Sequence, residues 1–201
     1  MPLSPLDPTT ALVLIDLQRG IVSPPSVPYT GAEVVARCKE LAGAFRAAGL
    51  PVVLVNVSFG ADFADLPKGR DEEPTTTAED LPPVGWDIIV DELGAQDTDI
   101  RVTKHQWGAF HGTDLDTQLR RRGVTQIVLA GITSSRGVDT TGREAYAHNY
   151  SVAFVTDAIA DRDLVDHEHV IDRVFPQIGE RGTVAEVLEL LATSTAKGVS
   201  L

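Results

Sequence analysis

The chain has 201 residues, a length that suits one domain with a sizeable hydrophobic core. Its 17 basic and 29 acidic residues give a formal net charge of −12 at pH 7, which argues against nucleic acid or an anionic membrane surface as a partner. No stretch approaches the roughly 20 apolar residues of a membrane-spanning helix, and the proline-rich N-terminus does not resemble a signal peptide. We therefore expect a single cytoplasmic domain over residues 1–201.

Apolar runs of strand length alternate with helical patterns along the chain. The first predicted strand, 11–15, ends at Asp16, and an amphipathic helix over 31–48 ends at Gly49. Strands that are apolar throughout and alternate with helices are typical of a parallel sheet covered on both faces. The pattern predicts an α/β fold, a doubly wound, mostly parallel sheet in a Rossmann-like three-layer arrangement. The remaining predicted strands are 52–57, 100–103, 125–130 and 151–156.

Three further helices are expected in the second half of the chain. Thr113 is the predicted N-cap of a helix that extends to Arg122. Another helix begins near Ser134 and separates the last two predicted strands. The final helix opens at Thr183, where Glu186 would complete a capping box.

Two features of the first half are less tied to regular structure. The segment 58–98 is rich in Pro, Asp, Glu and Thr, and a connection this long is either a functional loop or a mobile linker. Cys38 is the only cysteine, so a disulfide within the chain and a cysteine-based zinc site are excluded. We expect Cys38 to be a small buried hydrophobe on its helix.

Polar groups follow three of the predicted strands at their carboxyl ends. They are Asp16, Lys104 and the turn 131–137. Ligands of open α/β sheets bind at these ends, where the order of winding reverses, so we expect the three to cluster. Taken singly, an Asp at a strand end is more often a turn or cap residue, and a Lys there is usually a solvated charge.

The turn carries the most specific motif of the chain. Residues 131–145 read G-I-T-S-S-R-G-V-D-T-T-G-R-E-A. They resemble the nucleophile turn of the isochorismatase-like cysteine hydrolases, whose pattern is roughly G-x-x-T-x-x-C-V-x-x-T-A-R-x-A. Gly137 stands where that pattern has its catalytic cysteine, so covalent acyl transfer has no obvious nucleophile. Isochorismatases proper are similar to this chain in having glycine there.

The resemblance extends from Asp16 to the last helix, and it implies an isochorismatase-like fold in a homodimer or homotetramer. It also implies that Asp16 and Lys104 match the family's catalytic Asp and Lys, and that the peptide bond before Thr133 is cis. Trp107 and Phe110, close to Lys104 in sequence, join the expected substrate contacts.

The implied reaction is hydrolysis of a small anionic substrate, a vinyl ether such as isochorismate, without a covalent intermediate. Asp16 would protonate the methylene carbon, which requires a carboxyl pKa raised by burial. Lys104 would orient the substrate, although its charge lowers the pKa of Asp16 until an anionic substrate neutralises it. Gly137 would leave room for water, and the amides around Thr133–Gly137 would bind an oxyanion or carboxylate.

Some positions leave alternatives open. Thr133 stands where isochorismatases carry tyrosine, and it is the choice of the cysteine enzymes. Arg136 either clamps a substrate carboxylate by bidentate pairing or is a surface arginine. Ser134 and Ser135 are expected to cap the helix, because no histidine is placed by the sequence to activate them.

Three functions follow in order of preference. The first is the non-covalent hydrolase. The second is a catalytically inactive family member that binds a small carboxylate or a protein partner, and the third is an amidase with an unrecognised nucleophile. No cofactor is expected. No catalytic metal is expected either, since the stretch 56–62 has no histidine, unlike the Asp-x-His motif of the related nicotinamidases.

Overall fold

The computed structural model describes residues 3–67, 69–70, 72 and 82–196. Its strands form one six-stranded sheet in the order β3-β2-β1-β4-β5-β6, and all the neighbouring strands are parallel. The strands are β1 (Thr10–Ile15), β2 (Val52–Val57), β3 (Ile100–Lys104), β4 (Gln126–Ile132), β5 (Ser151–Ala160) and β6 (Glu180–Gly182).

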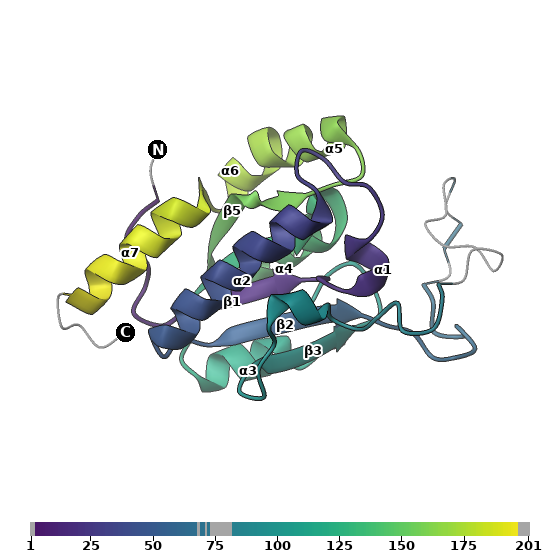
Figure 1. Ribbon diagram of the computed structural model, residues 1–201, viewed down its shortest axis with the longest axis horizontal. Helices are drawn as coiled ribbons and strands as arrows, with labels where there is room; N and C mark the ends of the chain where they lie inside the picture. Colours follow the sequence, from purple (N-terminus) through teal and green to yellow (C-terminus); the bar gives the residue numbers. More distant parts are fainter. Residues whose placement is uncertain (1–2, 68, 71, 73–81, 197–201) are drawn as a thin grey trace.

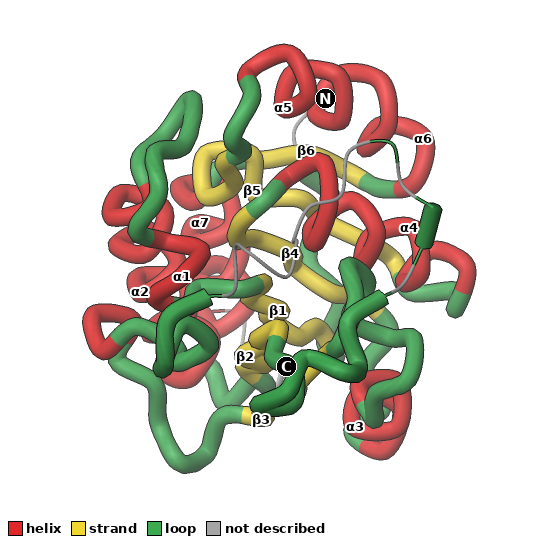
Figure 2. Tube along the Cα trace, turned by 90° about the vertical axis from the view of Figure 1, so that its right-hand side faces the viewer, coloured by secondary structure: helices red, strands yellow, loops and turns green. Residues whose placement is uncertain are grey.

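Helices cover both faces of this sheet. They are α1 (Arg19–Val22), α2 (Gly31–Ala47), α3 (Leu115–Arg121), α4 (Asp139–Ala147), α5 (Leu164–His169), α6 (Phe175–Ile178) and α7 (Val184–Ala196). Figure 2 shows α2 and α7 on one side of the sheet and α3, α4 and α6 on the other. The predicted doubly wound, three-layer α/β fold is confirmed.

The order of winding reverses beside the central strand (Figure 1). The chain passes from β1 to β2 and β3 on one side, and then crosses over so that β4 pairs with the other edge of β1. Every residue of β1 is buried, which explains its uninterrupted apolar sequence. The carboxyl ends of β1 and β4 therefore form the switch point at which ligands of such sheets bind.

Several element boundaries differ from the predictions by a few residues, and two differences have a clear structural reason. Strand β5 ends at Ala160 rather than at 156, because it continues to pair with β4 after a register shift between Leu129 and Gly131. The N-cap position of α3 is Asp114 rather than Thr113, because the helix begins at Leu115. Thr113 Oγ1 nevertheless accepts from the Leu115 N–H at 3.2 Å, and it donates to the carbonyl of Ala109 at 2.6 Å.

The last helix begins as predicted. Glu186 accepts a hydrogen bond from the Thr183 N–H at 2.7 Å, and Thr183 Oγ1 accepts from the Glu186 N–H at 3.3 Å. This reciprocal pairing is a capping box, and it fixes the start of α7.

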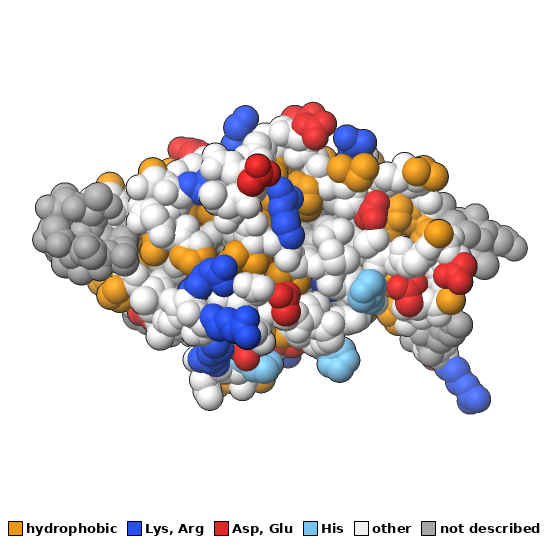
Figure 3. Space-filling view, turned by 90° about the horizontal axis from the view of Figure 1, so that it is seen from below, with side chains coloured by type: hydrophobic (Ala, Val, Ile, Leu, Met, Phe, Trp, Pro, Cys, Tyr) orange, Lys and Arg blue, Asp and Glu red, His pale blue; other side chains and the backbone are white. Residues whose placement is uncertain are grey.

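On the face that Figure 3 shows, orange hydrophobic side chains lie among blue Lys and Arg and red Asp and Glu side chains. Within the part of the chain that the structure describes, no helix has both the length and the apolar character needed to cross a membrane.

Candidate functional site

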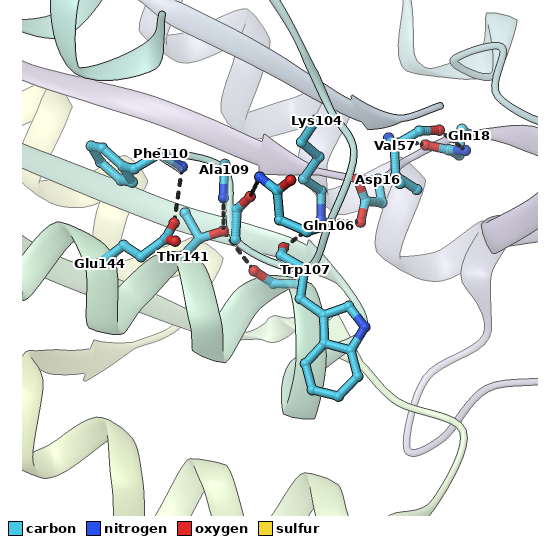
Figure 4. A network of polar contacts seen from close by, with 12 residues as sticks. Asp16, Gln18, Val57, Lys104, Gln106, Trp107, Ala109, Phe110, Thr141 and Glu144 are labelled. Carbon is cyan, nitrogen blue, oxygen red and sulfur yellow. Dashed lines mark hydrogen bonds and ion pairs between the residues drawn. The ribbon is translucent and has the colours of Figure 1, made fainter. Parts of the chain in front are cut away.

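The predicted cluster forms at the switch point of the sheet. Asp16 directly follows β1, Lys104 is the last residue of β3, and Gly137 lies in a π-helical turn (Ser134–Val138) after β4. Lys104 Nζ lies 2.8 Å from Asp16 Oδ2, and the two side chains are only 2% and 8% exposed. Figure 4 shows the pair beside the residues that hold it in place.

Asp16 combines an unusual backbone with an unusual carboxyl group. Its φ is +54°, a left-handed conformation that Asp and Asn adopt more readily than most residues. Among the residues that the structure describes, Asp16 Oδ1 has no hydrogen-bond partner although it is buried. An ionised carboxylate would hold such an oxygen at high cost.

Burial and Lys104 act in opposite directions on this group. Burial raises the pKa of the Asp16 carboxyl above its ordinary value, and the Lys104 ammonium lowers that pKa by a smaller amount. The expected lowering by Lys104 is therefore present, but desolvation outweighs it. The result is a carboxyl group that holds its proton at higher pH than an exposed Asp.

Lys104 is fixed by a second contact. Its ammonium donates to the carbonyl of Trp107 at 2.5 Å, in addition to the contact with Asp16. An ammonium has three N–H donors, so these two contacts leave one donor for a further acceptor.

Gly137 faces the ion pair at close range. A Cβ placed on it would lie 2.8 Å from Ile15 Cγ2, 3.0 Å from Asp16 Oδ2 and 3.3 Å from Lys104 Nζ. A methyl group there would force its neighbours to move.

The amides of this turn are partly used within the protein. The Ser135 N–H donates to Asp161 Oδ2 at 2.6 Å, and the Arg136 and Val138 N–H groups point to the Thr133 carbonyl at 3.4 and 3.0 Å. The prediction that the amides around Thr133–Gly137 bind an oxyanion is therefore wrong for Ser135.

The serine prediction also needs correction, because a histidine does reach Ser134. Ser134 Oγ donates to Asp161 Oδ2 at 2.7 Å and lies 3.0 Å from His167 Nδ1. Ser134 is fully buried, and Asp161 contacts the serine directly, whereas in a catalytic triad the carboxylate orients the histidine. Burial lowers the pKa of His167. We therefore assign this trio to holding the turn in place, which a sequence separation of 33 residues concealed.

The other predicted site residues are placed as follows. Thr133 is buried beside the turn, and the peptide bond that precedes it is cis. The Trp107 side chain is 51% exposed, and the guanidinium of the exposed residue Arg136 lies over its ring at 5.8 Å. The structure does not bring the Phe110 ring to the ion pair: it stacks on His148 at 5.1 Å, on the α4 side (Figure 4).

Part of the long predicted loop packs beside Asp16. The Arg19 N–H donates to the Ile88 carbonyl, and the Val90 N–H donates to the Leu17 carbonyl. Residues 86–90 thus run alongside the chain that leaves β1, as a functional loop would. The remainder of 58–98 includes residues 68, 71 and 73–81, which lie outside the described residues.

Gln18 is a residue of this region that the sequence reasoning missed. It is fully buried, and its side-chain amide exchanges two hydrogen bonds with the backbone of Val57, at 3.0 and 2.8 Å. Its position two residues after the strand-ending Asp16 was the available signal. It ties the segment after β1 to the end of β2.

The remaining predictions of the sequence concern Cys38 and metal ligands. Cys38 on α2 is fully buried, and burial raises the pKa of its thiol far above the ordinary value. Among the described residues, no group of three or more His, Cys, Asp or Glu side chains is placed to hold a metal ion.

Comparison with known proteins supports the family resemblance. A model of the isochorismatase domain matches residues 10–186. An uncharacterised isochorismatase family protein of Escherichia coli O157:H7, YecD, is 43% identical over 183 residues, covering 91% of this chain and 96% of that protein. The ureidoacrylate amidohydrolase RutB of Methylobacterium radiotolerans is 30% identical over 176 residues, covering 76% of this chain and 68% of RutB.

Two solved structures share the fold closely. An isochorismatase family protein from Burkholderia thailandensis has a TM-score of 0.89 and 46% identity, covering 93% of this chain and 97% of its own. A cysteine hydrolase from Pseudomonas syringae pv. phaseolicola 1448A has a TM-score of 0.83 and 27% identity, covering 96% of this chain and 97% of its own.

Proposed function

We propose that this chain, which belongs to the isochorismatase family, is a hydrolase that acts on a small anionic substrate without a covalent intermediate. Gly137 stands at the nucleophile position of the family motif, and Asp16 is the general acid. The preferred substrate class is a vinyl ether of a carboxylic acid, such as isochorismate.

One observation carries the proposal: Asp16 is a buried carboxyl group with a raised pKa and, within the described structure, an oxygen without a hydrogen-bond partner. In a protonated carboxyl group this oxygen can carry the proton. General acids work best when burial brings their pKa toward the working pH.

In the proposed reaction Asp16 acts first as an acid and then as a base. Asp16 transfers its proton to the methylene carbon of the enol ether, and the double bond becomes an oxocarbenium ion. Water adds to that ion and returns a proton to the Asp16 carboxylate. The hemiketal then collapses to a keto acid and an alcohol, so that the acid is regenerated.

Lys104 and Gly137 have distinct parts in this scheme. The remaining N–H of the Lys104 ammonium binds the substrate carboxylate, which offsets the effect of Lys104 on Asp16. Gly137 keeps a Cβ away from the pair, since that atom would lie 3.0 Å from Asp16 Oδ2 and 3.3 Å from Lys104 Nζ. Arg136 and Trp107 lie together at the surface of the turn, where they would contact the rest of the substrate together with Thr133.

The name of one relative supports the expected negative charge of the substrate, but it does not support cleavage of a vinyl ether bond. The name of the RutB relative describes an amidohydrolase acting on ureidoacrylate, which is itself a small carboxylate. That enzyme name favours an amide as a competing substrate class, so the test must include both.

The test compares the wild type with Asp16→Asn on isochorismate, other vinyl ethers, small amides and carbamoyl compounds. We expect turnover of a vinyl ether by the wild type and a loss of about 10²–10⁴-fold in Asp16→Asn, the range for a general acid. Asp91→Asn, an exposed carboxylate, is the matched control and should retain full activity. Unchanged turnover in Asp16→Asn would eliminate the acid role.

A second candidate is an inactive family member that binds a small carboxylate or a protein partner. Its support is the closure of the centre, where both charged side chains are almost inaccessible and a Cβ on Gly137 has no room. It predicts a thermal shift with a carboxylate but no turnover of any compound in the panel. Gly137→Cys would then test whether a thiol restores amidase activity.

The proposal includes assembly as a homodimer or homotetramer. Sedimentation equilibrium would distinguish these two states from a monomer of 21.5 kDa.

A further inference from the structure

The segment 105–110, which we call the strap, crosses the site between Lys104 and α4 (Figure 4). On its inner side the Trp107 carbonyl accepts a hydrogen bond from Lys104 Nζ at 2.5 Å. Within the strap, the Gln106 side chain donates to the Gly108 carbonyl at 3.3 Å. The strap therefore determines where one of the acceptors of the buried ammonium lies.

Two side chains of α4 hold the other side of the strap. Thr141 Oγ1 accepts from the Ala109 N–H at 3.2 Å and donates to the Gly137 carbonyl at 2.6 Å. Glu144 Oε2 accepts from the Phe110 N–H at 2.9 Å. Thr141 belongs to the family motif of the turn, whereas Glu144 stands at one of its variable positions.

Gly108 and Glu144 fit together with no space to spare. A Cβ on Gly108 would lie 2.3–2.4 Å from the three atoms of the Glu144 carboxyl group. The carboxylate therefore lies directly against the backbone of the strap, and any side chain at position 108 must push it away from the Phe110 N–H.

We propose that Glu144 is a positioning residue for Lys104: it anchors the strap, and the strap holds the Trp107 carbonyl against the ammonium. The anchoring of the strap by Glu144 is argued from these contacts alone. Its effect on turnover rests on the proposed function. Without the anchor, the Trp107 carbonyl moves, the ammonium loses a fixed acceptor, and its third donor no longer points at the substrate.

The first test needs no substrate. Amines of the folded protein are labelled by reductive methylation, and the rates at Lys104 and at the exposed residue Lys39 are measured by peptide mass spectrometry. Lys104 is 1% exposed, so its labelling reports opening of the strap. We expect Glu144→Ala to speed labelling of Lys104 by about tenfold, the factor for losing one hydrogen bond to a charged group, with Lys39 unchanged.

Four further variants make the test specific. Glu144→Gln keeps an oxygen acceptor for the Phe110 N–H and should restore protection of Lys104. Gly108→Ala should act like Glu144→Ala, and the double variant should add little, because both changes remove the same contact. Glu40→Ala, an exposed position on α2, controls for loss of a surface carboxylate.

Turnover provides the second test once a substrate is identified. Glu144→Ala should lower kcat by about tenfold with KM changed much less, and Glu144→Gln should recover most of kcat. Wild-type labelling rates at Lys104 in both Glu144→Ala and Gly108→Ala would overturn the proposal. If the wild type turns over no compound, only the proposed function is refuted. The labelling rates at Lys104 then decide whether Glu144 positions the strap.

Discussion

Two buried ion pairs lie at opposite ends of β3. At the amino end, Asp99 accepts two hydrogen bonds from the Arg46 guanidinium, at 2.9 and 2.8 Å, and one from the Gln96 N–H at 2.7 Å. At the carboxyl end, Lys104 contacts one oxygen of Asp16, and the other oxygen is unpaired as far as the described residues go.

We interpret the first pair as structural and the second as the pair of the proposed reaction. Arg46 on α2 and the Gln96 N–H together supply both oxygens of the Asp99 carboxyl group with hydrogen bonds. Asp16 keeps an oxygen unsaturated at a site where burial opposes ionisation. Buried polar groups are normally satisfied, and exceptions are expected where function requires them.

Breaking the saturated pair should have the largest effect. Arg46→Met leaves Asp99, whose side chain is 1% exposed, without its two strongest donors. We expect the free energy of unfolding to fall by about 3–5 kcal/mol, the range for removing one partner of a buried pair, with turnover per folded molecule unchanged. Urea denaturation measures this loss, and a fall under 1 kcal/mol would contradict the contrast.

The matching change at the other end is Lys104→Met. Asp16 can respond by keeping its proton, because its pKa is already raised, so the free energy of unfolding should change by less than about 1 kcal/mol. Turnover should fall by about 10²–10³-fold, as when a group that stabilises developing charge is removed. If Lys104→Met destabilises the fold as much as Arg46→Met does, the two pairs are alike.

Adding a methyl group in front of the reactive pair should have an intermediate effect. Gly137→Ala brings a carbon to within 3.0 Å of Asp16 Oδ2 and 2.8 Å of Ile15. We expect a loss of about 1–3 kcal/mol in stability together with reduced turnover. Gly43→Ala, with open space around it on α2, is the control and should not destabilise. Equal stability of the two variants would show that the site has room to spare.

The smallest effect is a pH dependence specific to Asp16. Its pKa is raised in the folded state, so above the ordinary value near 4 the folded protein binds more protons than the unfolded chain. The free energy of unfolding therefore falls as pH rises through this window, by at most about 1.4 kcal/mol per pH unit. Asp16→Asn lacks this dependence, so its stability relative to the wild type should increase from pH 4 upward, as followed by denaturation.

The same shift sets the pH dependence of turnover. As the proton donor, Asp16 must be protonated, so kcat/KM should fall above the raised pKa. A rate that increases with pH through this window would assign Asp16 the role of a base instead.

The sequence predicts the strands and the residues that lie at their carboxyl ends. Apolar runs predict the strands, and the rule that ligands bind at carboxyl ends of parallel strands predicts that Asp16 and Lys104 meet. Their separation of 88 positions does not matter, because the sheet brings those ends together. The family motif adds Gly137 to the same point.

The contacts that hold the site could not be predicted in the same way. His167 reaches Ser134 because β5 runs on to Ala160 after a register shift, and no periodicity in the sequence reveals such a shift. Glu144 reaches the strap across an irregular loop. Phe110 was assigned to the substrate from its nearness to Lys104 in sequence, but the irregular chain turns its ring toward His148. Loop geometry, rather than composition, decided these cases.

The burial of Cys38 has a consequence for how the protein responds to chemical stress. Hydrolases with an active-site thiol lose activity when electrophiles or peroxides modify it, because the reactive form is an accessible thiolate. Here the only sulfhydryl is enclosed beneath β5 and is held in the unreactive protonated form. Treatment with iodoacetamide or hydrogen peroxide should thus spare any activity that depends on Asp16.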